Sequence, residues 1–90
     1  MSVAAVPAPV QAAGVRTIRD LDVRPLLARG EEPFAAIMSA TDALRENEAL
    51  HLIVSFEPRP LYDVMRKRGY AAHTEREGGD VHVWFYRESA

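Results

Sequence analysis

The hydrophobic repeat of this chain changes its period close to Asn47. Before that residue, apolar positions recur every three or four residues, at Phe34, Ile37, Met38, Thr41 and Leu44. After it they recur every second residue, at Leu50, Leu52, Val54 and Phe56. A period near 3.6 is typical of a helix with one apolar stripe, and a period of 2 is typical of a half-buried strand. A helix that runs almost directly into a strand predicts a layered fold in which helices pack on a sheet.

A glycine pair near the C-terminal end adds a second constraint. Gly78-Gly79 separates two strand-like segments, residues 70–77 and 80–87. Two glycines suit the positive φ angles of a tight hairpin turn. We therefore predict that these segments form an antiparallel pair.

The remaining elements complete the sheet. Apolar residues predict a first strand over about residues 17–23, although their spacing does not keep a strict alternation, and residues 26–32 follow as a loop. Pro33 suits the first turn of the long helix, because its missing N–H has no helical partner there. Apolar residues at helical spacing predict a second, shorter helix between residues 61 and 69, which Gly69 closes.

The predicted element order is β-α-β-α-β-β. The first two strands are joined through a helix and can lie parallel, whereas the closing hairpin is antiparallel, so the sheet is mixed. We therefore expect an α/β fold of the α+β two-layer type, with two helices on one face of a four-stranded sheet. One thin core is expected, because a chain this short buries only about 60% of the surface that its unfolded form exposes.

The composition excludes several functions. The chain contains no cysteine, so thiolate catalysis, persulfide carriage, disulfides and cysteine-based metal sites are excluded. Its 11 basic residues do not exceed its 13 acidic residues, so no basic excess supports binding to nucleic acid through phosphates. No apolar run approaches the roughly 20 residues of a membrane helix. We expect neither a membrane nor a nucleic-acid partner.

The first residues of the chain are rich in alanine, valine and proline and carry no helical or strand repeat. We predict a disordered tail over residues 1–15 and a single domain over 16–88, because the tail gains too little by burial to offset its ordering entropy. The tail also lacks the basic start of a secretory signal, and Pro7 and Pro9 interrupt its apolar part. We therefore expect a cytoplasmic location.

Two local motifs resemble a known bacterial family. Leu21-Asp22-Val23-Arg24 is similar to the Leu-Asp segment that opens the domain of unknown function 2249 family, and residues 57–62, Glu-Pro-Arg-Pro-Leu-Tyr, are similar to its acidic-Pro-Arg-Pro-Leu turn. The resemblance covers about residues 18–88 and extends to the TusA/SirA-like sulfur carriers. It implies a TusA-like domain and, at most, a setting in redox or nitrogen metabolism.

The resemblance also implies what this chain lacks. In the sulfur carriers, a Cys-Pro-x-Pro motif opens the first helix, where the helix dipole and free N–H groups stabilise a thiolate or persulfide. The corresponding stretch here is Gly30-Glu31-Glu32-Pro33. Pro33 matches the second proline, but Gly30 stands where the sulfur-bearing residue would be, and the two glutamates would repel an anionic sulfur. We expect the scaffold without the carrier chemistry.

The predicted register places all three histidines on one face of the sheet. With the glycine pair as the hairpin loop, His73 lies opposite Trp84 and Glu75 lies opposite His82. The valines and phenylalanine of the last strand then point toward the helices. The other face, which we expect to be open, carries His51, His73, Glu75, His82, Trp84 and Tyr86.

Three interpretations of this open face remain. It can be merely solvated, because aromatic residues suit a pleated surface. It can bind a protein partner or a second copy of the chain, because exposed Trp84 and Tyr86 are typical of recognition surfaces. It can also hold a metal or haem through His73 and His82 on adjacent strands, with help from Glu75, although no compact metal-binding motif supports this.

A second candidate surface is a rim formed by Gly30, Glu32, Pro33 and Arg59. Arg59 lies between two prolines at a helix start, where it can join free backbone N–H groups around an anionic ligand. The alternative is a simple ion pair with Glu57 or Asp63.

The basic residues 66–68 raise an RNA-binding alternative. Arginine and lysine are, however, favoured at the C-terminal end of any helix, because the helix dipole is negative there.

We expect a non-catalytic binding or regulatory module without a required cofactor. No Ser/His/Asp arrangement, no carboxylate pair in an apolar setting and no phosphate-binding glycine loop predicts an enzyme. The alternatives are a metal- or haem-associated accessory protein in redox or nitrogen metabolism, and an RNA-binding domain.

Overall fold

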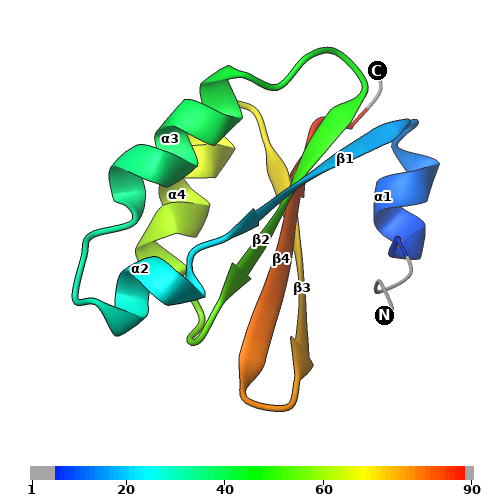
Figure 1. Cartoon of the computed structure of the whole chain (residues 1–90). Coiled ribbons are helices and arrows are strands. Elements are labelled where there is room, and N and C mark those ends of the chain that lie inside the picture. The colour runs from blue at the N-terminus through cyan, green and yellow to red at the C-terminus, as the bar shows by residue number, and fades with distance from the viewer. Residues whose placement is uncertain (1–5, 89–90) are drawn as a thin grey trace.

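The computed structural model describes residues 6–88. The elements in chain order are α1 (Ala8–Ala12), β1 (Thr17–Asp22), α2 (Arg24–Ala28), α3 (Phe34–Asp42), β2 (Glu48–Val54), α4 (Arg59–Lys67), β3 (Ala71–Glu77) and β4 (Asp80–Tyr86). Figure 1 shows α2, α3 and α4 on one side of the sheet and α1 on the other. The mixed four-stranded sheet with its helical layer confirms the predicted fold class, to which α1 and α2 are additions. No helix within residues 6–88 has the length and apolar character needed to cross a bilayer.

The strands lie in the order β1-β2-β4-β3. β1 and β2 are parallel, whereas β4 pairs antiparallel with both β2 and β3. The hairpin register is the predicted one, with His73 opposite Trp84 and Glu75 opposite His82. Of the two turn glycines, Gly78 is the one with a positive φ, at 62°.

The main core lies between the sheet and the helices α2, α3 and α4. Its sheet side consists of alternating residues of β2 and β4, namely Leu50, Leu52, Val54, Val81, Val83 and Phe85. Ile37 of α3 and Leu61 and Met65 of α4 cover these side chains. The amphipathic repeats of both helices therefore face the sheet, as their spacing predicted.

Two residues with a positive φ mark the points where helices give way to strands. Gly69 has a φ of 93° and ends α4 in a Schellman motif, in which its N–H donates to Arg66 and the N–H of Tyr70 donates to Met65. Asn47 has a φ of 68° and lies just before β2, where the hydrophobic period changes.

α2 replaces part of the loop that we predicted over residues 26–32. Pro25 occupies its first turn, where proline needs no N–H partner, and Leu26 and Leu27 pack against the main core. Five residues are too few to display a helical repeat, which is why the pattern alone did not reveal this helix.

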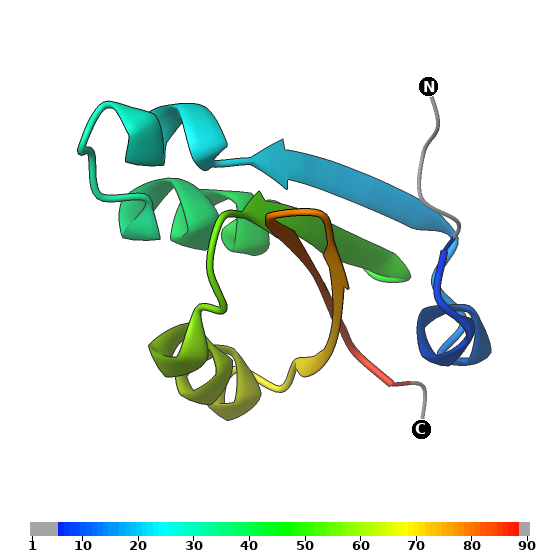
Figure 2. The ribbon, with the colours of Figure 1, turned by 90° about the horizontal axis from the view of Figure 1, so that it is seen from below.

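α1 packs on the opposite face of the sheet, as the two views in Figures 1 and 2 show. Val10 is fully buried in a small second cluster with Ala49, Trp84 and Tyr86. The described residues of this segment thus differ from the disordered tail that we predicted over residues 1–15, of which residues 1–5 lie outside the described range. Contact with the sheet stabilises so short a helix, and such contact leaves no periodic signal.

The second cluster explains the irregular spacing in β1. Ile18 packs toward the α1 side of the sheet, whereas Leu21 and Val23 pack toward the main core. The break in alternation therefore reflects apolar residues of one strand that pack on opposite faces of the sheet.

Two phenylalanines that we predicted for the core are exposed. Phe34 is the first residue of α3 and is 45% exposed, and Phe56 follows β2 and is 52% exposed. Each continues a hydrophobic repeat at the end of an element.

Candidate functional site

The sheet face opposite α2, α3 and α4 carries two rows of side chains that cross all four strands. The first row consists of Asp20, His51, Trp84 and His73 in direct register. The second row consists of Asp22, Ile53, His82 and Glu75. The register thus brings all three histidines together on the predicted face and adds two aspartates from β1. We call Asp20, His51, His73, Glu75, Glu77 and His82 the histidine patch.

His51 is the centre of a hydrogen-bonded chain. Its Nδ1 lies 2.8 Å from Oδ1 of Asp20, and its Nε2 lies 2.8 Å from Nδ1 of His82. Because a carboxylate only accepts, the Nδ1–H of His51 donates to Asp20. The Nε2 of His51 then has no proton when the ring is neutral, so it accepts a hydrogen bond from the Nδ1–H of His82.

The same hydrogen bonds determine which tautomer neutral His82 adopts. With the proton on Nδ1, its Nε2 is bare, and Nε2 lies 3.6 Å from Oε1 of Glu77. Two groups that can only accept therefore face each other. The space between them therefore suits a bound cation.

Trp84 lies beneath the patch and is not part of its surface. Its ring stacks on His51 with a centroid separation of 4.5 Å and an interplanar angle of 6°. Trp84 is only 2% exposed and Tyr86 only 5%, and both belong to the cluster under α1. Burial raises the pKa of Tyr86. The predicted face is correct, but the prediction that Trp84 and Tyr86 form an open aromatic surface is wrong.

α1 divides this sheet face into two halves. The apolar half lies under α1 and includes Ile18, Ala49, Ala71 and Tyr86. The polar half lies toward the hairpin turn and leaves Asp20 and Glu77 with 65% and 77% of their side-chain surface exposed. The uncovered part of the face is therefore polar, not aromatic.

Carboxylates dominate the polar half. Arg24 lies at its edge and bridges Asp22 at 2.7 Å and Asp80 at 2.8 Å. Hydrogen bonding to Arg24 lowers the pKa of Asp22. Each carboxylate of the histidine patch is instead paired with a histidine: Asp20 with His51, Glu75 with His73 and Glu77 with His82. This half of the face is negative whenever the imidazoles are neutral.

The predicted metal site required His73 and His82 to face a common ion. In the structure they do not. The Nε2 of His73 lies 3.0 Å from Oε2 of Glu75, whereas His82 faces His51 and Glu77. Within residues 6–88, no three His, Asp or Glu side chains are grouped so that they could hold a metal ion by themselves. An ion at this patch would have two protein ligands, and water would complete its coordination.

The predicted rim residues make local contacts. Gly30 follows α2 with a φ of 75°, Glu32 accepts a hydrogen bond from the N–H of Phe34, and Pro33 precedes α3. Arg59 is paired with Glu57 at 3.3 Å, which is one of the two structural partners that we considered. Among the described residues, no hydrogen bond or ion pair links Arg59 to the segment around Gly30.

The basic end of α4 is partly neutralised. Arg66 is paired with Asp63 at 2.8 Å and Arg68 with Asp42 at 2.7 Å. These ion pairs reduce the positive charge that this helix end could offer to phosphates.

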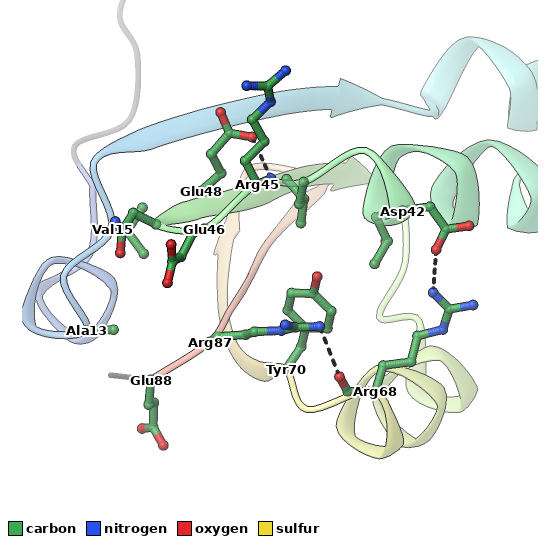
Figure 3. Close-up of a pocket in the computed structure, with 13 residues that line it drawn as sticks. Ala13, Val15, Asp42, Arg45, Glu46, Glu48, Arg68, Tyr70, Arg87 and Glu88 are labelled. Carbon is green, nitrogen blue, oxygen red and sulfur yellow. Dashed lines mark hydrogen bonds and ion pairs between the residues drawn. The ribbon is translucent and has the colours of Figure 1, made fainter. Parts of the chain in front are cut away.

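A hollow of about 840 Å³ lies at another part of the surface, where the ends of α3 and α4 approach the start of β2 (Figure 3). Three arginines and four carboxylates line it. Arg68 is held by Asp42, and the guanidinium of Arg87 lies 4.6 Å from the ring centre of Tyr70. Because opposite charges nearly balance, the lining favours neither a cationic nor an anionic ligand.

Sequence reasoning missed Asp20 and Glu77 as residues of the site. Glu77 could have been found, because the predicted hairpin register already placed it beyond Glu75 on the same face. Asp20 could not, because the pairing of β1 with β2 depends on tertiary packing that no local pattern records.

The histidine patch lies within the part of the chain that matches a known protein family. A family model described as "Uncharacterized conserved protein (DUF2249)" matches residues 20–87, which leaves α1 outside the match. No curated protein and no solved structure matches the chain significantly.

Proposed function

The chain belongs to the family described as "Uncharacterized conserved protein (DUF2249)", and because this description names no activity, we propose from the site that the protein is a non-catalytic binding module. Its ligand is a basic segment of a protein partner, and its binding surface is the polar half of the sheet face. A location in the cytoplasm and a TusA-like ancestry without sulfur chemistry are part of the same proposal.

The observation that carries this proposal is the charge of the uncovered half-face. Five carboxylates, three imidazoles and one arginine gather there, and that arginine is already held by Asp22 and Asp80. A surface of this kind attracts a positively charged segment and speeds its encounter. The exposed carboxylates of Asp20, Glu75 and Glu77 are available to lysine and arginine side chains.

The chemistry of the patch supports binding over catalysis. The hydrogen bonds through His51 and His82 end on carboxylates and, within residues 6–88, reach no hydroxyl nucleophile. The same charges disfavour a dimer in which two patches meet, because like charges would be placed opposite each other. The partner is therefore a different protein.

Photo-crosslinking in the native cell tests this surface. A photoreactive benzoylphenylalanine at Glu75 should capture one discrete partner, whereas the same residue at Lys67, on the outer surface of α4, should not. The double change Glu75→Lys and Glu77→Lys should abolish the capture of that partner by a crosslinker at Asp20.

A matched charge control is available elsewhere on the surface. Glu46 and Glu88 are also exposed, so Glu46→Lys with Glu88→Lys changes the net charge equally without touching the patch and should leave capture intact. Equal capture from Glu75 and Lys67, or equal loss with both double variants, would refute the proposal.

A further inference from the structure

We propose that the Nε2 of His82 and the carboxylate of Glu77 bind a divalent transition-metal ion such as Zn²⁺. The inference rests on the position of these two groups and on the hydrogen bonds that link His82 to His51 and His51 to Asp20. It requires neither a protein partner nor any property of the rest of the patch.

The two atoms already have a separation suited to a bridging ion. Nε2 of His82 and Oε1 of Glu77 lie 3.6 Å apart. Zinc lies about 2.0–2.1 Å from imidazole nitrogen and about 2.0–2.2 Å from carboxylate oxygen, so an ion between them would subtend an angle of roughly 120°. This angle is close to that of a tetrahedral site.

The groups behind His82 prepare it to be a ligand. A metal needs a nitrogen without a proton, and the hydrogen bond from Nδ1–H of His82 to His51 leaves Nε2 in that state. His51 is in turn held by Asp20 at 2.8 Å and is only 8% exposed. A hydrogen-bonded residue behind the ligating imidazole is the usual arrangement in metal sites, because it fixes the tautomer and the ring orientation.

The third histidine provides an internal comparison. His73 and Glu75 also form an imidazole–carboxylate pair, but their atoms lie 3.0 Å apart in a direct hydrogen bond. An ion bound to both atoms at that distance would subtend an angle of roughly 90°, well below that of a tetrahedral zinc site. Nε2 of His73 also carries the proton that it donates to Glu75, whereas Nε2 of His82 is bare.

Water from the solvent would supply the remaining ligands of the ion. Glu77 is 77% exposed and the side chain of His82 is 15% exposed, so solvent reaches the ion from the Glu77 side. Carboxylate and imidazole together suit zinc and its neighbours in the first transition series better than calcium or magnesium.

Isothermal titration of Zn²⁺ into the full chain, produced without a histidine tag, tests this site. The expected result is one ion per chain, with affinity lowered at least tenfold by His82→Gln and by Glu77→Gln. His73→Gln should leave the affinity unchanged. Asp20→Ala, which removes the last residue of the supporting chain, should weaken binding by about 10- to 100-fold.

The exposed position of Glu77 keeps the test decisive even if the His82 variant folds poorly. Circular dichroism should show that Glu77→Gln is folded like the wild type. The proposal is overturned if Glu77→Gln binds zinc as the wild type does, if His73→Gln loses as much affinity as His82→Gln, or if millimolar zinc produces no heat of binding. Unchanged affinity in Asp20→Ala would remove the role of the supporting chain.

Discussion

Trp84 shows how a single residue can lie on the predicted face and still have another role. Trp84 is 2% exposed, and its ring stacks on His51. Trp84→Ala should therefore destabilise the protein by about 3–5 kcal/mol, because it removes a buried aromatic ring and leaves a cavity. Urea unfolding followed by circular dichroism measures this loss, which is large for a domain whose total stability is about 5–15 kcal/mol.

Phe56→Ser is the matched comparison for Trp84→Ala. Phe56 is 52% exposed, so this change should alter the free energy of unfolding by no more than about 0.5 kcal/mol. If Trp84→Ala is equally mild, Trp84 is not a buried support of the patch.

Glu48 gives a prediction about pH. The backbone N–H of Arg45 and the guanidinium of Arg19 donate to its carboxylate and lower its pKa in the folded state. A pKa that is lower in the folded than in the unfolded state adds stability above the unfolded pKa, and this stability is lost as the pH falls through the folded pKa. Wild type should therefore be more stable than Glu48→Gln near neutral pH, and the difference should shrink in acid.

Urea unfolding of both proteins across a pH series checks this dependence. Asp42→Asn is a useful control, because Asp42 is paired with Arg68 on the surface and no backbone N–H among the described residues donates to it. A stability difference between wild type and Glu48→Gln that stays constant from neutral to acidic pH would contradict the account.

Among the elements, α1 is the one whose role is easiest to isolate. Val10 is its buried residue, and the main core under α2, α3 and α4 does not include it. Val10→Asp should detach α1, because a charged side chain replaces an apolar one at a fully buried position. We expect a loss of about 1.5–3 kcal/mol, a red shift of the Trp84 fluorescence and easier quenching by acrylamide, while the far-ultraviolet circular dichroism stays near that of the wild type.

Ala8→Asp serves as the control for this change, because Ala8 lies in the same helix and is exposed. Its Trp84 fluorescence should match that of the wild type. If Val10→Asp leaves the emission of Trp84 unchanged, α1 does not seal the apolar half of the sheet.

The elements also show what a sequence pattern can and cannot reveal. The repeats around Asn47 and the glycine pair predicted β2, α3 and the register of the final hairpin, because each is specified by local periodicity or turn chemistry. α1 and α2 have five residues each and were not predicted, because tertiary contacts stabilise them. The irregular spacing in β1 reflects apolar residues that pack on opposite faces of the sheet, but it could be understood only after α1 was placed.

At the scale of the whole molecule, the candidate site depends on how these elements meet. The sequence predicted that His51, His73 and His82 share a face, because strand alternation and hairpin register decide this. It did not predict the hydrogen bonds of His51 to Asp20 and His82. These depend on the parallel pairing of β1 with β2 and on the register between β2 and β4. The prediction that the whole face is open was also wrong, because α1 covers its apolar half.

The metal site proposed at His82 depends on where the protons of the patch lie. Asp20 directs the proton of His51 to Nδ1, and His51 in turn directs the proton of His82 to Nδ1. His73 has the opposite arrangement, because its Nε2 donates to Glu75. One fold therefore holds two histidines in one tautomer and the third in the other.

Long-range nitrogen–proton NMR of the imidazole rings, recorded in alkaline solution, measures these tautomers directly. The account predicts that the neutral rings of His51 and His82 carry their proton on Nδ1, and that His73 carries it on Nε2. A neutral His82 with its proton on Nε2 would contradict the account, because the nitrogen that faces Glu77 would then be a donor and no longer a free ligand.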